Sequence, residues 1–82
     1  METEIKREYY SNGQLMYEWP MLNGKSHGFM KRWYDNGNIQ YIYPYLNGLS
    51  QGMNQDWHKN RARNWIRQWK NDNRHGLRIR FK

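Results

Sequence analysis

The sequence repeats itself with a period of 24 residues, and this repeat narrows the possible folds sharply. Residues 20–28 read PMLNGKSHG, and residues 44–52 read PYLNGLSQG. Aligned in register, units 7–30 and 31–54 share 10 of 24 positions, and a third, degenerate unit, 55–78, keeps the pattern only in part. Such a period predicts one small structural unit per repeat, stacked so that each unit buries part of its neighbour.

Each unit is expected to be a β-hairpin, because Asn-Gly between alternating apolar segments is a strong short-range hairpin signal. The sequence therefore predicts an all-β fold: a single elongated, twisted antiparallel meander of about seven strands, in one domain spanning residues 1–82. A terminal strand to residue 82 follows the third unit. The expected strands cover residues 6–10, 15–21, 28–34, 39–45, 52–58, 63–70 and 76–82.

Glycine marks the expected turns. Ser11-Asn12-Gly13 and Asp35-Asn36-Gly37 are predicted to be three-residue loops that end in a residue with positive φ, which glycine adopts without strain. The third unit has Arg61 and Asp72 in place of turn glycines, so strained or remodelled turns are expected there. The glycines assigned to structural turns are Gly13, Gly24, Gly28, Gly37, Gly48, Gly52 and Gly76.

The aromatic side chains share a parity. Twelve of the 14 aromatics stand at odd positions, and only Tyr10 and Tyr34 are even. Side chains alternate between the faces of a strand, so turns that preserve parity would place all twelve on one face. Three explanations for so large a patch stay open: packing within a curled sheet, a homodimer interface, and a binding platform. The twelve are Tyr9, Tyr17, Trp19, Phe29, Trp33, Tyr41, Tyr43, Tyr45, Trp57, Trp65, Trp69 and Phe81.

The repeated residues resemble those of a known family. Tyr-Tyr-x-Asn-Gly-x-Leu, Leu-Asn-Gly-Lys-x-His-Gly and Trp-Tyr-x-Asn-Gly-x-Ile follow one another in residues 9–39. This pattern is similar to the variant MORN repeat. The resemblance implies a twisted sheet of stacked hairpins with no catalytic activity, used for protein–protein binding and oligomerisation. Some members of the family are antitoxin or immunity proteins, and some related repeats are linked to phospholipids.

The sequence offers little to catalysis. It has no cysteine, and its histidines are His27, His58 and His75. His27 and His75 occupy the same repeat position before a glycine, which favours a loop role over metal binding. No enzyme, metal or cofactor is therefore expected. The polar N-terminus and the lack of an apolar run of about 18 residues predict a cytoplasmic protein without a transmembrane segment.

Positive charge gathers in the third unit. Residues 59–82 hold nine basic residues and one acid, Asp72, in a chain of net charge +7. Acidic partners are favoured by such a field. The predicted function is a binding module for an acidic protein surface, in a small inhibitor or antitoxin-like role; the alternative is a DNA- or RNA-binding protein that uses the basic, aromatic C-terminal third. The predicted partner-binding residues are Arg63, Trp65, Arg67, Trp69, Arg74, Arg78, Arg80 and Lys82.

In the terminal strand, the parity rule directs Leu77, Ile79 and Phe81 to the aromatic face and Arg78, Arg80 and Lys82 away from it. The same rule pairs Lys6 with Glu18 across the first hairpin.

Overall fold

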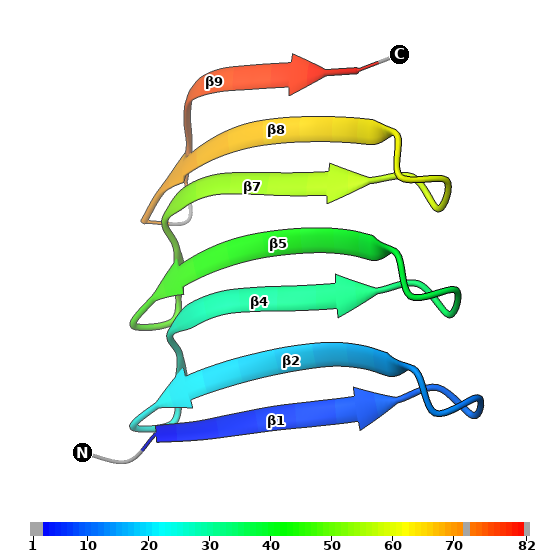
Figure 1. The fold of residues 1–82 in the computed structure, drawn as a ribbon. Coiled ribbons are helices and arrows are strands. Elements are labelled where there is room, and N and C mark those ends of the chain that lie inside the picture. The colour runs from blue at the N-terminus through cyan, green and yellow to red at the C-terminus, as the bar shows by residue number, and fades with distance from the viewer. Residues whose placement is uncertain (1–2, 72, 82) are drawn as a thin grey trace.

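The computed structural model describes residues 3–71 and 73–81, without the side chains of residues 74, 75 and 77. These residues form one open antiparallel sheet and no helix (Figure 1). The strand order is β1-β2-β4-β5-β7-β8-β9, with β3 paired to β2 and β6 paired to β5. The all-β prediction is confirmed.

The seven long strands lie close to their expected positions. The strands are β1 (Thr3–Tyr9), β2 (Leu15–Leu22), β3 (Lys25–Ser26), β4 (Gly28–Trp33), β5 (Ile39–Leu46), β6 (Leu49–Ser50), β7 (Gly52–Trp57), β8 (Arg63–Lys70) and β9 (Asn73–Arg80). The two-residue strands β3 and β6 are not anticipated by the sequence. Each of them continues a tight Asn-Gly turn before the chain crosses to the next long strand.

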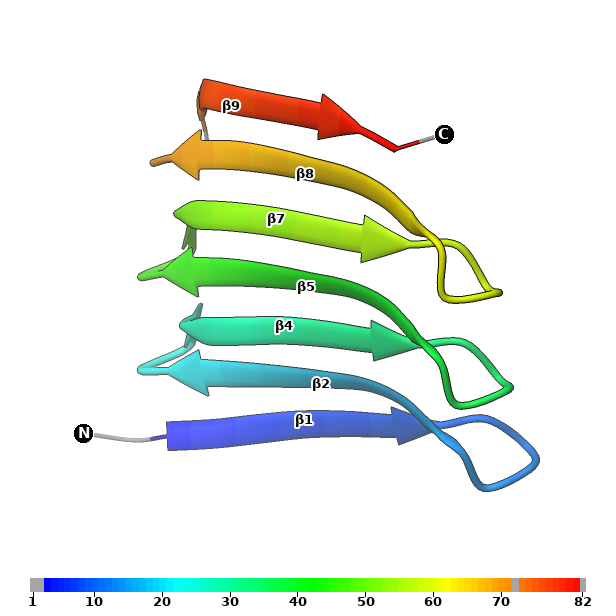
Figure 2. The ribbon, with the colours of Figure 1, turned by 45° about the horizontal axis from the view of Figure 1, so that its top comes forward.

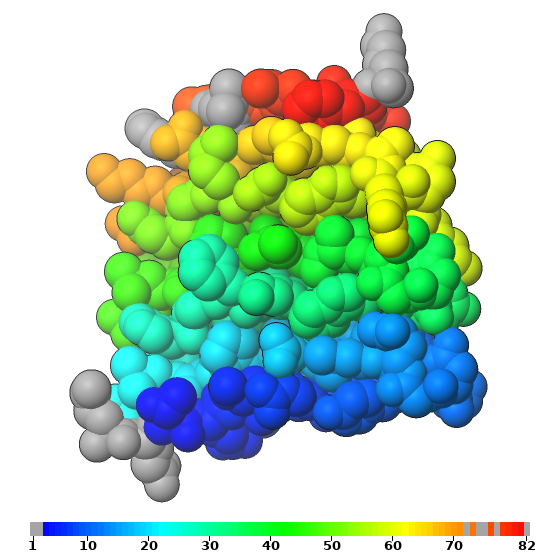
Figure 3. All heavy atoms as spheres, viewed as in Figure 1, coloured from blue at the N-terminus to red at the C-terminus, as the bar shows by residue number. Residues whose placement is uncertain are grey.

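The sheet is a single layer. Its dimensions are 37 × 35 × 11 Å, so three units make a slab that is about as tall as it is wide. Figure 3 shows one face of this slab, on which side chains cover the sheet from β1 to β9. All the wide loops lie along one side edge, where they bend out of the sheet, and all the tight turns lie along the other (Figure 2).

The wide loops have the predicted three-residue form. Tyr10 N donates to Gln14 O at 2.8 Å, Gly13 N donates to Tyr10 O at 2.9 Å, and Gly13 has φ +88°. The third unit keeps the same hydrogen bonds between His58, Arg61 and Ala62, with Arg61 at φ +75°. This turn is therefore not remodelled, but it holds a non-glycine residue in a conformation that L-residues disfavour. All seven predicted turn glycines have positive φ.

A β-bulge next to each wide loop overturns the parity argument. Tyr9 pairs with Leu15, but Glu8 pairs with Tyr17, so Met16 is an extra residue on β2. The same shift recurs in the other two hairpins. One extra residue exchanges the faces of the side chains of β2 relative to those of β1, and the two-residue turn between Leu22 and Lys25 exchanges them again before β4. Arg7, rather than Lys6, consequently pairs with Glu18, and their side chains form an ion pair at 2.9 Å.

The prediction that twelve aromatics share one face is therefore wrong. Cross-strand partners in an antiparallel ladder lie on the same face, which divides the aromatics into two sets. Face A carries the aromatics of β2, β5 and β8: Tyr17, Trp19, Tyr41, Tyr43, Tyr45, Trp65 and Trp69. Face B carries the aromatics of β1, β4 and β7 and the one that follows β9: Tyr9, Phe29, Trp33, Trp57 and Phe81.

The core is a shallow row of side chains beneath face A. Met30, which pairs with Tyr43, is only 1% exposed, and Tyr43 stacks on Tyr41 with ring centroids 4.2 Å apart. Asn54 occupies the repeat position of Met30 and is 8% exposed. Packing between neighbouring strands thus buries part of the aromatic surface within the single layer.

Hydrogen bonds join each unit to the next and explain the two even aromatics. The Tyr10 hydroxyl donates to the Trp33 carbonyl, and the Tyr34 hydroxyl donates to the Trp57 carbonyl, both at 2.7 Å. On the opposite edge, the backbone N–H of Asn47 donates to His27 Nδ1 at 3.4 Å. The loop role predicted for His27 is confirmed, whereas the side chain of His75 lies outside the described residues.

Candidate functional site

Four residues of the third unit form a compact cationic group on face A, which we call the Trp65 cluster: Trp65, Arg67, Arg78 and Arg80. The guanidinium carbon of Arg67 lies 4.6 Å from the centroid of the Trp65 ring, and those of Arg78 and Arg80 each lie 5.5 Å away. Contacts of this length are cation–π interactions. One indole therefore organises three positive charges.

The register of β8 and β9 builds the cluster. Trp65 pairs with Arg80, and Arg67 pairs with Arg78, so all four side chains share face A. The prediction that Arg78 and Arg80 point away from the Trp65 face is wrong, because Lys70 pairs with Asn73 with two residues between them, which sets even residues of β9 opposite odd residues of β8. Ile79, which was expected on the aromatic face, pairs with Ile66 on face B and is 37% exposed.

The cluster carries a net positive charge. Arg67 and Arg78 stand directly opposite each other, an arrangement that is destabilising for like charges. The acid nearest in the ladder is Asp56, the partner of Trp65 on β7. The two ion pairs found among the described residues, Arg7–Glu18 and Asp35–Lys59, include none of the cluster arginines.

The remaining predicted binding residues do not join this cluster. Arg63 lies on face B, with its guanidinium carbon 5.9 Å from the Trp57 ring centroid and 5.5 Å from that of Phe81. Trp69 is on face A opposite Gly52, and its buried indole N–H has no hydrogen-bond acceptor among the described residues. Only the backbone pairing of Arg74 with Trp69 is described, and Lys82 lies outside the described residues.

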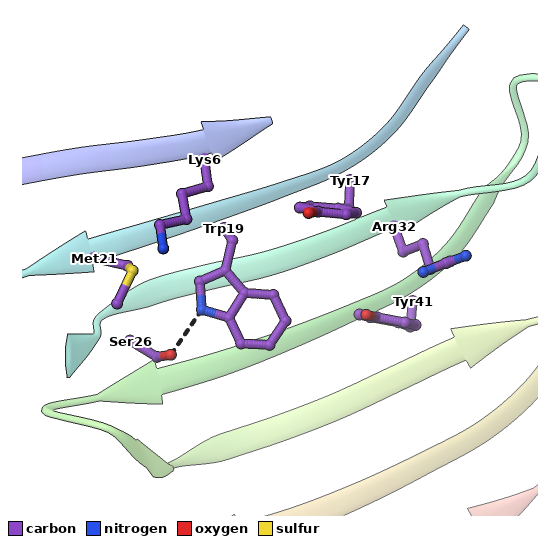
Figure 4. A pocket seen from close by; sticks show the side chains of 7 residues that line it. All are labelled: Lys6, Tyr17, Trp19, Met21, Ser26, Arg32 and Tyr41. Carbon is purple, nitrogen blue, oxygen red and sulfur yellow. Dashed lines mark hydrogen bonds between the residues drawn. The ribbon is translucent and has the colours of Figure 1, made fainter. Parts of the chain in front are cut away.

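A pocket of about 520 Å³ lies at the other end of face A, where the sequence predicts no site. Its lining comes from β1 to β5 and consists of Lys6, Tyr17, Trp19, Met21, Ser26, Arg32 and Tyr41 (Figure 4).

The indole N–H of Trp19 donates to Ser26 Oγ at 2.7 Å and so fixes one wall of this pocket. Burial raises the pKa of the Tyr41 phenol, and the nearby Arg32 guanidinium opposes that shift. A signal for the pocket is present in the repeat itself: Met30 and Asp56 stand 24 residues after Lys6 and Arg32, so neither positive charge recurs one period later.

Comparison with protein families identifies the repeat. The model of the MORN repeat variant matches residues 5–23 and 26–47, which together make up half of the chain. The chain belongs to the MORN repeat variant family. Repeats of this family are generally interaction modules. Comparison with curated proteins and with solved structures found no match.

The structural repeat extends beyond the residues that the family model matches. Strands β7, β8 and β9 continue the same sheet, and the Trp65 cluster lies entirely in this part of the chain. The MORN repeats thus account for the scaffold, while the cluster is a feature of the degenerate unit.

Residues 3–71 and 73–81 contain no group of three or more His, Asp or Glu side chains arranged to hold a metal ion. They also contain no helix long and apolar enough to cross a membrane.

Proposed function

We propose that this chain is a non-enzymatic interaction module that binds an acidic protein surface through the Trp65 cluster. The observation that carries the proposal is the set of three guanidinium groups held over one indole, with no ion pair to any described carboxylate. Tryptophan and arginine are the residue types that most often dominate protein–protein binding energy.

Stacking prepares these arginines for carboxylates. A guanidinium that lies over an aromatic ring keeps its N–H groups at the edge free, and these donors match a carboxylate in a bidentate geometry. The ring also restricts the side-chain rotamers before binding, which reduces the entropy lost on association. An acidic partner would in addition relieve the repulsion between Arg67 and Arg78.

This mode of action needs no catalytic group. A small slab that covers an acidic surface would block whatever that surface binds or cleaves, which is the way an inhibitor or antitoxin-like protein acts. The proposal places the partner on face A of the third unit, while the first two units supply a rigid support.

Nucleic-acid binding is the second candidate, because aromatic and arginine side chains together also favour single strands. The position of the three guanidinium groups weighs against it. They cover the Trp65 ring, so a base could stack there only after displacing a cation–π contact. Binding to phosphates would show a steep dependence on salt and competition by unrelated DNA.

The test compares two double charge reversals in captures from a lysate of the native host. The first is Arg78→Glu with Arg80→Glu, and the control is Lys25→Glu with Lys70→Glu, two exposed lysines outside the cluster. A partner retained by the wild type and the control but lost by the cluster variant would be purified and titrated by calorimetry. We expect its affinity for the cluster variant to fall by at least about 30-fold.

Two outcomes would contradict the proposal. Equal losses in both double variants would show that net charge, rather than the cluster, governs binding. A log–log salt slope near −0.9 per phosphate contact, with competition by unrelated duplex DNA, would assign the cluster to nucleic acid.

A further inference from the structure

We propose that the pocket on face A between β1 and β5 binds a small, flat aromatic anion, such as an aromatic carboxylate or phosphate. This site is separate from the Trp65 cluster, and the inference does not depend on the proposed function. The volume of about 520 Å³ lies within the usual range of small-molecule sites.

The walls of the pocket suit a flat ring. Tyr17, Trp19 and Tyr41 supply aromatic surface, and Met21 adds a polarisable apolar contact. In Figure 4 the two tyrosine rings lie on either side of Arg32, and the Trp19 indole lies beside them. Aromatic rings pack favourably in offset or edge-to-face arrangements, so a planar ligand would be held by several rings at once.

One end of the pocket can hold an anionic group. Lys6 pairs with Trp19 across β1 and β2, and its ammonium group enters neither of the two ion pairs found among the described residues. Ser26 Oγ accepts the indole N–H of Trp19, so the Ser26 hydroxyl hydrogen is free to donate to a ligand. Figure 4 shows Lys6 and Ser26 at the same end, on either side of the indole nitrogen.

The other end carries a second positive charge. Arg32 already interacts with the Tyr41 phenol, whose pKa it lowers against the effect of burial. Its charge would add to the field on a bound anion, while Lys6 and Ser26 would make the direct contacts. The expected contribution of Arg32 to affinity is therefore smaller than that of Lys6.

The equivalent position 24 residues later shows how such a pocket can be filled. Met30 replaces Lys6 there and fills the space so completely that it is 1% exposed, and Asp56 replaces Arg32. The tyrosines of β5 pack together beside Met30, as the stacking of Tyr41 on Tyr43 shows; the third tyrosine is Tyr45. The site between β1 and β5 carries two positive charges where the equivalent residues carry one negative charge, and it has an open volume; both features suit an anion.

The surroundings favour a compact ligand over an extended acidic chain. Glu4 pairs with Met21 and Glu8 pairs with Tyr17, so both carboxylates share face A with Lys6. Neither lines the pocket, but both would repel an acidic segment that ran along β1. A small anion that reaches only Lys6 and Ser26 avoids them.

The test uses 2-naphthoate as the probe and the indole N–H signals of the five tryptophans as the readout in a ¹H–¹⁵N correlation spectrum. We expect saturable movement of the Trp19 signal, with the signals of Trp33 and Trp57 on face B unchanged. The neutral analogue 2-naphthamide has the same ring and should bind at least about tenfold more weakly, because it lacks the charge.

Three variants and a control locate the anion. Lys6→Gln should weaken 2-naphthoate binding by about tenfold and Arg32→Gln by about threefold, since one loses a contact and the other only a field. Lys6→Met copies the closed interval and should abolish binding while the other indole signals show an intact fold. Lys31→Gln removes the same charge from the opposite face of β4 and should leave affinity unchanged.

The inference is wrong if 2-naphthamide binds as tightly as 2-naphthoate, or if Lys31→Gln weakens binding as much as Lys6→Gln. It is also wrong if only the Trp65 or Trp69 signals move, because the probe then occupies the other end of face A. None of these outcomes bears on the capture experiment with the cluster variants, so the two proposals can fail separately.

Discussion

Two glycines with different surroundings should lose different amounts of stability when they are replaced by alanine. Gly13 has φ +88°, and a Cβ there would meet no atom within 4 Å. Gly28 has φ +112°, and a Cβ there would lie 3.3 Å from Pro20 Cγ. Gly13→Ala therefore measures backbone strain alone, whereas Gly28→Ala measures strain together with a steric clash.

The expected magnitudes follow from these surroundings. Left-handed strain of about 1–2 kcal/mol at Gly13 is offset by about 0.4–1 kcal/mol from the lower entropy of the unfolded alanine chain, which leaves a net loss of about 0.5–1 kcal/mol. At Gly28 the strain rises to as much as about 3 kcal/mol, because φ lies farther from the left-handed helical region, and crowding against Pro20 adds about 1 kcal/mol. The net loss there is about 2–4 kcal/mol.

Thermal and urea unfolding of both variants checks these values. At about 4–8 °C per kcal/mol for a domain of this size, Gly13→Ala should lower the melting temperature by about 2–8 °C and Gly28→Ala by about 8 °C or more. Combining Gly28→Ala with Pro20→Ala in a double-mutant cycle should recover the steric part, about 1 kcal/mol. Equal losses for the two glycines, or no coupling between Gly28 and Pro20, would refute the reasoning.

Two further stability predictions concern tyrosines. Tyr34→Phe should lower the free energy of unfolding in urea by about 1 kcal/mol, because the Tyr34 hydroxyl donates to the Trp57 carbonyl at 2.7 Å. The control Tyr9→Phe, at a site that is 58% exposed, should leave stability unchanged. Equal effects of the two variants would show that the hydrogen bond between units does not stabilise the fold. Burial raises the pKa of Tyr41 and Tyr43, so the folded state holds these protons more tightly than the unfolded state does. The stability that these groups contribute is complete below the ordinary pKa of 10.0 and should fall as the pH rises above it. The melting temperature should therefore be lower at about pH 10.5 than at about pH 8, and this difference should be smaller in the Tyr41→Phe, Tyr43→Phe double variant; an unchanged difference would contradict the assignment.

The repeat predicted the backbone well because turn chemistry is local. Asn-Gly pairs at a fixed period set the loop lengths, and the seven long strands follow from the distance between them. The sides of the sheet could not be predicted from parity alone. The bulge residue Met16 reads as an ordinary strand residue, yet it exchanges the faces of the side chains of β2 relative to those of β1.

The register between strands decided which parts of the site could be predicted. Trp65, Arg67 and Trp69 lie on one face because they alternate within one strand, which needs no register. The faces of Arg78 and Arg80 depend on the pairing between strands, and that part of the prediction was wrong. The pocket could not be predicted from the sequence for a related reason. Lys6 reaches face A only through the shifted register, which sets it opposite Trp19.

The third unit keeps the geometry of its wide loop with Arg61 in place of glycine because this loop is bonded to the loop before it. Arg61 Nε donates to Asn38 Oδ1 at 2.8 Å, and Asn38 Nδ2 donates to the Lys59 carbonyl at 2.9 Å. Lys59 also forms an ion pair with Asp35 at 2.9 Å. These contacts help to hold Arg61 at a positive φ that costs an L-residue about 1–2 kcal/mol. With the backbone fixed from the side of the second unit, the side chains of β8 and β9 can diverge from the repeat. The Trp65 cluster is such a divergence. Its arginines Arg67 and Arg78 stand opposite each other and repel, so this arrangement does not stabilise the repeat itself.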